Sequence, residues 1–328
     1  MSLKLVNFTL PEAPCECDSC ECITRTGVIV GDKVLDIETL SARNDECCHT
    51  LDCVASILAC DTALAQARQM VECCEAGNAP EDAIFDLASV KLEAPILYPG
   101  KLLCLAGNYA DHILESTSKK LQGTGVTESD MATPRIFMKP PGNTVCGNGD
   151  PIIVTKGAQF VDYEAEFGLI IGKPGKFISQ EDALDHVSGI TIVNDISERE
   201  LKIWDRPEDR DWDKFFDWLN GKWCDNFAPM GPCAVPLSDL ENVDRLGIKL
   251  WVNDELRQDG NTGQMIFKIP DIVEYASSIF TLETGDVIAT GTPSGVGHAQ
   301  GLKLQPGDVV RVELEGVGTL VNPVVAEG

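Results

Sequence analysis

From Lys101 to its end, the sequence is a succession of short strand-like segments separated by glycine and proline. Their β-branched and apolar residues, flanked by turn residues, are typical of β-strands. The segments are LLCLAG, RIFMKP, DYEAEFGLIIG, GITIVND, IKLWVND, DVIATGTP, DVVRVELEG and TLVNPVV. Strands and helices do not alternate regularly and no G-x-G-x-x-G motif occurs, so we do not expect a Rossmann domain. The pattern favours a mixed α+β fold dominated by sheet.

The N-terminal part of the chain is predicted to form a separate, smaller unit. Two strand-like pieces, Thr26–Val30 and Lys33–Ile37, flank a Gly-Asp turn and predict a hairpin. An alanine- and cysteine-rich stretch predicts a helix over Leu51–Glu75. The proline-rich segment LEAPILYPG then suggests a linker. We therefore predict a small domain over residues 1–95 and a main domain over residues 100–328.

Only a few helices are expected in the main domain. Ser179-x-x-Asp182 and Ser197-x-x-Glu200 have the form of capping boxes that begin helices. Pro270 suits the first turn of a helix that runs to about Phe280.

The chain is strongly acidic, with a formal net charge of −26 and a pI near 4.4. A negative field repels nucleic acid and anionic membranes, so neither is an expected partner. An anionic substrate would need local positive charge, which a bound cation provides. The favoured interpretation of the acidity, however, is that it mainly serves solubility or a saline cytosol. The sequence has no apolar run long enough for a membrane helix and no signal peptide, which predicts a cytoplasmic protein.

Cysteines are concentrated near the N-terminus, where ten of the fourteen fall within the first 74 residues. Four of them form a C-x-C-x2-C-x-C cluster: Cys15, Cys17, Cys20 and Cys22. This spacing differs from the paired C-x2-C arrangement of common zinc sites, so reduced thiols are favoured over a structural metal. The same interpretation applies to Cys47-Cys48-His49 and Cys73-Cys74.

The segment Val161–Gly172 contains three acidic residues at alternate positions. In a strand, this spacing places Asp162, Glu164 and Glu166 on one face. The apolar end of the segment implies burial, where carboxylates repel one another and lose hydration. A hard divalent cation would compensate, because Mg²⁺ and Mn²⁺ prefer oxygen ligands. The alternative is an edge strand with a solvated acidic face.

A second segment favours the metal site. Gly189–Asp195 is an apolar strand that ends in Asn-Asp. An aspartate at the end of a buried strand is well placed to supply a third oxygen ligand, although in isolation Asp195 would be read as a turn residue.

Taken together, these segments resemble the fumarylacetoacetate hydrolase family over roughly Lys101–Gly328. The residues that carry the resemblance, in chain order, are GNYADH (107–112), FMKP (137–140), DYEAE (162–166), NDISER (194–199), GK (221–222), FAPMGP (227–232), TGTPSGVG (290–297) and PGD (306–308). Each motif is modest alone, but their number and order argue against chance.

The resemblance implies a β-roll-like catalytic domain, usually in a homodimer, with a Mg²⁺ or Mn²⁺ site. The family's metal ligands fall on Glu164, Glu166 and Asp195. Its catalytic His–Glu pair falls on His112 and Glu115. A helix over Tyr109–Leu121 would place these two side chains on one face, where the carboxylate orients the imidazole for proton transfer.

The resemblance also assigns residues around the metal. Lys222 matches the lysine that stabilises a developing enolate or oxyanion. Arg199 and Thr292 match positions that bind the substrate carboxylate. Where many members carry glutamine seven residues after the metal aspartate, this chain has Lys202, whose charge could favour a more anionic substrate or point to solvent. The aromatic and charged stretch Trp204–Asn220 could wall the pocket or contact a partner subunit.

The predicted function is divalent-metal-dependent hydrolysis of a C–C bond in a small 2-oxo or 1,3-diketo acid, of the acylpyruvate or fumarylacetoacetate type. The alternatives within the family are a decarboxylase or lyase, a hydratase and an isomerase, acting on substrates of the oxaloacetate, ureidoglycolate or 2-oxo-4-enoate type. A non-catalytic metal-binding relative and a cysteine-based zinc or redox protein are the rivals from other classes.

Overall fold

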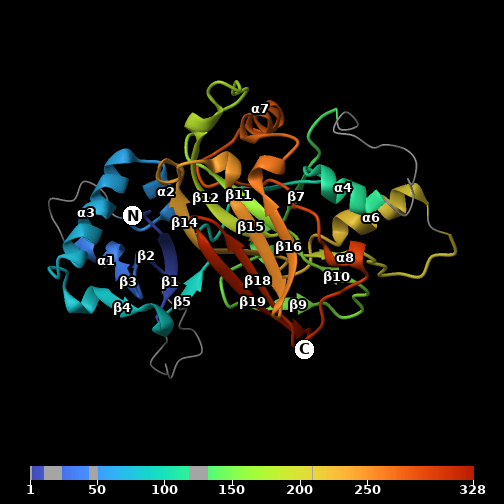
Figure 1. The fold of residues 1–328 in the computed structure, drawn as a ribbon, viewed down its shortest axis with the longest axis horizontal. Coiled ribbons are helices and arrows are strands. Elements are labelled where there is room, and N and C mark those ends of the chain that lie inside the picture. Colours follow the sequence, from blue (N-terminus) through green and yellow to red (C-terminus); the bar gives the residue numbers. More distant parts are fainter. Residues whose placement is uncertain (1, 11–23, 44–50, 118–131, 209) are drawn as a thin grey trace.

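The computed structural model describes residues 2–10, 24–43, 51–117, 132–208 and 210–328 (Figure 1). Most of its strands form one large sheet. Their order across it is β4 (Ile84–Asp86), β3 (Lys33–Asp36), β2 (Arg25–Val30), β1 (Leu5–Thr9), β14 (Ala228–Pro236), β12 (Val187–Asn194), β11 (Ala165–Ile171), β17 (Val287–Ala289), β6 (Leu102–Leu105) and β7 (Ile136–Lys139). Beside this path, β5 (Lys91–Glu93) pairs with β1 and β8 (Val145–Cys146) with β14.

Two smaller sheets complete the β-structure. One has the order β16 (Glu255–Asn261), β15 (Gly247–Val252), β18 (Val309–Leu314), β19 (Gly318–Ala326) and β9 (Ile152–Val154). The other consists of β10 (Val161–Asp162) and β13 (Ser197–Glu198). In Figure 1 the orange and red strands of the five-stranded sheet lie in front of the green strands β11 and β12. Strand-rich sheets with separate helices confirm the α+β prediction.

The α-helices of the described residues lie outside the sheets. They are α1 (Ile37–Ala42), α2 (Val54–Leu58), α3 (Asp61–Glu75), α4 (Ala110–Thr117), α5 (Pro141–Thr144), α6 (Asp211–Asn220), α7 (Ile269–Ile279) and α8 (Gly297–Gln300). None of the helices in the described part of the chain is long and apolar enough to cross a membrane.

Strand β11 is buried on both faces, and this explains its nearly continuous apolar sequence. Phe167, Leu169 and Ile171 belong to the core shared with the five-stranded sheet. Ile170 belongs to a second core that includes residues of α2 and α3. Side chains alternate between the faces of a strand, so both faces must be apolar when both are covered. The strand is therefore held between two cores in the centre of the molecule.

Several predicted elements are confirmed. The N-terminal hairpin is formed by β2 and β3, and the helix at Pro270 is α7. The N-terminal strands nevertheless continue the large sheet, because β1 pairs with β14 through Leu5 and Ala234. The division into domains 1–95 and 100–328 therefore stays a proposal.

Other boundaries were predicted incorrectly. The stretch Leu51–Glu75 is two helices, α2 and α3, rather than one. Ser197 does not begin a helix: it lies in β13, and its hydroxyl donates to the backbone oxygen of Asp195 at 2.9 Å. Ser179 and Asp182 do bond each other, but a short 3₁₀ turn follows instead of an α-helix. Such polar residues stabilise turns as well as helix ends, and the pattern alone does not separate the two.

Two other predictions lie partly or wholly outside the described residues. Helix α4 confirms the first part of the predicted Tyr109–Leu121 helix, and residues 118–121 lie outside the described ranges. The cysteine cluster at 15–22 and Cys47-Cys48-His49 also lie outside them. Cys73 and Cys74, at the end of α3, are free thiols, and the prediction that they bind no metal stays untested.

Candidate metal centre

Three buried carboxylates meet at the end of the central strands. Glu164, Glu166 and Asp195 each offer an oxygen, and these oxygens all lie within 4.8 Å of one another. Strands β11 and β12 are antiparallel, with Ala165 opposite Asn194, so the start of one strand lies beside the end of the other. This pairing brings Asp195 to the two glutamates. Because β11 lies between β12 and β17, the alternative of a solvated edge strand is wrong.

Asp162 does not join this cluster, although the alternation pattern placed it on the same face. The strand is interrupted between β10 and β11, so the two-residue period does not extend back to Asp162. Its Oδ1 accepts from the backbone N–H of Gly297 at 2.7 Å, and its Oδ2 accepts from Arg199 Nε at 2.9 Å. Asp162 therefore organises the neighbouring loop and arginine.

Two buried lysines neutralise part of the negative charge. Lys222 Nζ lies 2.6 Å from both Glu164 Oε2 and Asp195 Oδ2. Lys139 Nζ lies 2.5 Å from Asp195 Oδ1 and donates to the backbone oxygen of Ile196 at 2.8 Å. Sequence reasoning gave Lys139 no role. The sequence did contain a clue. Lys139 lies two residues after Phe137 in a short apolar strand, so the two side chains share its buried face.

The carboxylates of the cluster have different proton affinities. Burial alone would raise the pKa of Glu164, but Arg199, Lys222 and His112 together hold it well below its ordinary value. Glu166 lacks comparable compensation. Burial, together with the charges of Asp195 and Glu164, raises the pKa of Glu166 well above its ordinary value, against the opposing effects of Lys222 and the Gly291 N–H.

These residues fit a hard divalent cation. They present several anionic oxygens in a water-poor position, and the raised pKa of Glu166 shows that the protein leaves one carboxylate undercompensated. Oxygen ligands of this kind suit Mg²⁺ or Mn²⁺. Glu164, Glu166 and Asp195 would hold the ion, and this assignment stays a prediction.

Metal affinity should therefore depend on pH. Because metal-free Glu166 holds its proton above the ordinary carboxyl range, binding of Mg²⁺ should release that proton. The apparent affinity should rise with pH, by up to about tenfold per unit, until the metal-free pKa is passed, and then level off. Calorimetry in two buffers with different ionisation enthalpies measures the released proton. Zero proton release between pH 5 and 8 would contradict the raised pKa.

His112 and Glu115 form the predicted pair. His112 Nδ1 lies 2.9 Å from Glu115 Oε1, and its Nε2 lies 3.8 Å from Glu164 Oε1. The Glu115 carboxylate also accepts from the backbone N–H of Gly295, at 2.8 and 3.0 Å to its two oxygens. Helix α4 thus supplies both side chains from one face, and the glycine loop fixes the carboxylate. In the neutral tautomer that donates Nδ1–H to Glu115, Nε2 carries a lone pair and can act as a base.

A cavity of about 300 Å³ joins these groups. It is lined by Leu105, Ala106, Gly107, His112, Phe137, Glu164, Glu166, Arg199, Trp218, Lys222, Thr292, Val296 and His298. The volume is at the lower end of the range for ligand pockets, which suits a small substrate. Of the residues predicted to bind substrate, Arg199 and Thr292 line this cavity. Lys202 does not: it is exposed and lines a neighbouring cavity with Trp223 and Asn220.

The aromatic stretch before Lys222 contributes one wall. Trp218, in α6, packs edge-on against Phe137 with ring centroids 5.2 Å apart. The Lys222 ammonium lies 5.0 Å from the Phe137 ring centroid and 5.9 Å from that of Trp218. Two rings beside a buried ammonium exclude water and strengthen its electrostatic effect on a bound anion. The predicted pocket-wall role of this stretch is thus seen at Trp218.

The Thr292 hydroxyl is already engaged. It donates to the backbone oxygen of Ala165 at 2.9 Å and accepts from Gln258 Nε2 at 2.8 Å. Gln258 Oε1 in turn accepts from the Ala165 N–H at 3.0 Å. Gln258, which sequence reasoning missed, therefore ties the threonine loop to the carboxylate strand from the five-stranded sheet.

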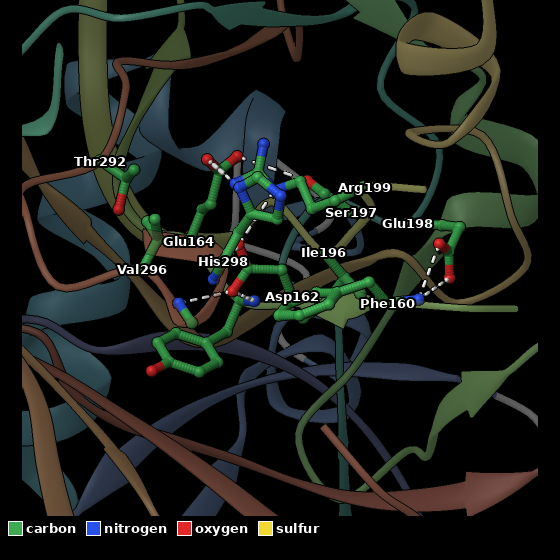
Figure 2. A network of polar contacts seen from close by, with 12 residues as sticks. Phe160, Asp162, Glu164, Ile196, Ser197, Glu198, Arg199, Thr292, Val296 and His298 are labelled. Carbon is green, nitrogen blue, oxygen red and sulfur yellow. Dashed lines mark hydrogen bonds and ion pairs between the residues drawn. The ribbon is translucent and has the colours of Figure 1, made fainter. Parts of the chain in front are cut away.

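Arg199 lies between two carboxylates, as Figure 2 shows. Its Nε donates to Asp162, and its Nη2 contacts Glu164 Oε1. Burial opposes a charged guanidinium, but Glu164 and Asp162 raise the pKa of Arg199, which keeps it cationic at the cavity wall. His298, also on this wall, was not singled out from the sequence; its position directly after the glycine-rich motif was the available signal.

Known proteins are similar to this chain over most of its length. The family model for the fumarylacetoacetate (FAA) hydrolase C-terminal domain matches residues 101–325. An oxaloacetate tautomerase of Bacillus subtilis is 38% identical over 301 residues, which cover 89% of each chain. A mitochondrial oxaloacetate tautomerase of Xenopus laevis is 40% identical over 244 residues, covering 74% of this chain and 70% of the relative.

A solved structure extends the similarity to the N-terminal part. Maleylpyruvate hydrolase from a Sphingobium species, in complex with manganese(II) and pyruvate, has a TM-score of 0.72 and 27% identity. The match covers 99% of this chain and 100% of that one.

Proposed function

The chain belongs to the fumarylacetoacetate hydrolase family and is an enzyme, and we propose that it interconverts the enol and keto forms of a small 2-oxo dicarboxylic acid of the oxaloacetate type. The observation that carries the proposal is His112 Nε2, which is oriented by Glu115 and lies in the same small cavity as Glu164 and Glu166. The similarity to two oxaloacetate tautomerases supports the choice of reaction.

The chain's own residues account for binding and proton transfer. Arg199 presents a permanent positive charge to a substrate carboxylate. Lys222, beside the carboxylate cluster, stabilises negative charge that develops on the 2-oxo oxygen. A Mg²⁺ or Mn²⁺ ion held by Glu164, Glu166 and Asp195 supplies Lewis-acid polarisation of the 2-oxo group when bound.

We assign the proton transfers to the His112–Glu115 pair. In the keto-to-enol direction, His112 Nε2 removes a proton from the carbon next to the 2-oxo group, and Glu115 stabilises the resulting imidazolium through Nδ1. The imidazolium then gives that proton to the enolate oxygen, which completes the enol. In the reverse direction His112 takes the enol O–H proton and delivers it to the carbon. The apolar wall of Phe137 and Trp218 keeps bulk water from the charged groups during both transfers.

A second candidate is hydrolysis of a C–C bond in an acylpyruvate, the reaction predicted first from the sequence. The full-length similarity to maleylpyruvate hydrolase favours it. In that reaction Lys222 would stabilise the enolate that leaves, and the His112–Glu115 pair would activate water. The two candidate reactions use the same residues. They differ in whether an activated water attacks a second carbonyl group of the substrate.

One screen separates the candidates. EDTA-treated protein, with and without added Mg²⁺ or Mn²⁺, would be assayed with oxaloacetate, an acylpyruvate, fumarylacetoacetate and ureidoglycolate. We expect metal-restored enol–keto interconversion of oxaloacetate, followed by the ultraviolet absorbance of the enol. Metal-restored hydrolysis of the acylpyruvate without tautomerisation would transfer the proposal to the second candidate. Inactivity on all four, with metal bound, would instead support a non-catalytic relative.

We also propose a cytoplasmic homodimer; the assembly follows from the family resemblance. Size-exclusion chromatography with light scattering measures the assembly directly, and a monomer would contradict it.

A further inference from the structure

The cavity contains a basic side chain that the chemistry described above does not use. His112, Arg199, Lys222 and His298 are the histidine, arginine and lysine residues that line it. Lys222 is engaged by Glu164 and Asp195, Arg199 by Asp162 and Glu164, and His112 by Glu115. The His298 ring packs edge-on against Phe160, with centroids 5.2 Å apart and planes at 83°. Within the described ranges its ring nitrogens have no hydrogen-bond partner.

The backbone of His298 is fixed relative to Arg199. Asp162 Oδ2 accepts from the His298 N–H at 3.2 Å and from Arg199 Nε at 2.9 Å, so one buried oxygen positions both residues. The other oxygen, Oδ1, accepts from the Gly297 N–H at 2.7 Å. Figure 2 shows Asp162 with both residues beside it. The backbone of His298 is thus held beside Arg199 on the cavity wall.

His298 and the carboxylate cluster differ in their access to solvent. Glu164, Glu166 and Asp195 are buried, whereas His298 is exposed while still lining the cavity. His298 therefore lies at the mouth and the carboxylates at the floor. A 2-oxo dicarboxylate held with its 2-oxo group at the floor directs its second carboxylate, on the far side of the reacting carbon, toward the mouth.

We propose that His298 binds the distal carboxylate of a 2-oxo dicarboxylic acid and so makes the enzyme selective for diacids over monoacids. The proposal rests on the proposed function, because it assumes a 2-oxo acid bound at the floor of this cavity. An imidazole donates a hydrogen bond to a carboxylate in either protonation state, and a charged partner makes that bond stronger than a neutral one. His298 is a specificity residue, and the proton transfer stays with His112.

The test compares a diacid with its monoester. Oxaloacetate and its 4-methyl ester would be assayed with Mg²⁺-supplemented wild type, His298→Ala, His298→Lys and the control Lys303→Ala. Lys303 is a nearby surface cation whose Nζ donates to the Gln159 backbone oxygen and which does not line the cavity. We expect His298→Ala to raise KM for oxaloacetate about tenfold or more, with kcat and the ester KM little changed. His298→Lys should recover part of the preference, and Lys303→Ala should behave as wild type.

The outcomes separate this proposal from the proposed function. An equal rise of KM for both substrates would show a structural role, and an unchanged KM ratio would show that the ring does not contact the distal carboxylate. Either result overturns the inference while leaving tautomerisation intact. If wild type turns over neither substrate, the proposed function fails. Calorimetric Kd values for the two compounds then decide the inference: a diacid preference that is lost in His298→Ala supports it, and a ratio that is the same in both proteins overturns it.

Discussion

Glu164→Gln is expected to abolish metal-dependent turnover while the chain remains folded. Glu164 is one of three buried carboxylates whose oxygens converge, and its low pKa keeps it ionised for a cation. Replacing a partner that only orients a ligand costs about 10- to 100-fold in metal affinity, so loss of a direct ligand should exceed the upper end of that range. Calorimetric titration with Mn²⁺, together with activity on oxaloacetate, measures both effects.

A matched control distinguishes ligand loss from general disruption. Glu198 is also buried, and its carboxylate accepts from the Phe160 N–H at 2.8 and 3.0 Å, but it is not part of the metal cluster. Glu198→Gln should therefore keep its metal affinity. Both variants would be compared by circular dichroism and thermal unfolding. Wild-type metal affinity in folded Glu164→Gln would refute the ligand assignment.

His112→Ala should have nearly the opposite signature: metal binding is retained and turnover is lost. A positioned general base contributes about 10²- to 10⁴-fold to a rate, and kcat should fall within that range. His112 contacts Glu164 only through Nε2 at 3.8 Å, so its loss should change metal affinity little. Steady-state kinetics and Mn²⁺ titration of the same preparation test both halves of the prediction.

His186 provides the control imidazole for this experiment. It is buried away from the cavity, and its Nδ1 lies 2.7 Å from the backbone oxygen of Lys173. His186→Gln should keep full activity per folded molecule. A fully active His112→Ala would rule out the proton-transfer role and leave His112 as a structural residue of α4.

The site shows what a linear pattern can and cannot predict. The three carboxylates and the His–Glu pair were predicted mainly from the resemblance to the family, which short motifs in the chain carry. Strand and helix spacing was compatible with these roles but did not select them. Lys139 and Gln258 were missed because a single polar residue in an apolar strand gives no indication of its partner. Lys202 was placed near the substrate because it replaces a glutamine of many family members. It is exposed at a separate cavity, which agrees with the alternative that it points to solvent.

Asp162 illustrates the same limit within a correctly recognised motif. Alternation holds only while the backbone stays in one strand, and here β10 pairs with β13 while β11 pairs with β12 and β17. The change of pairing partner turned Asp162 toward Arg199 and the Gly297 loop. Strand breaks of this kind depend on distant segments, which the local sequence does not describe.

The sequence by itself determined the α+β class and the family, because these depend on local strand and helix patterns and on short motifs in the chain. Through that resemblance it also supplied the prediction that Glu164, Glu166 and Asp195 bind a metal and that His112 and Glu115 act as a pair. Only the tertiary structure decided how the charges are paired, which side chains share the cavity, and that the N-terminal strands extend the large sheet. Those features are set by contacts between residues far apart in the chain. Their energies depend on burial and on the distance between charges, and both are properties of the folded molecule.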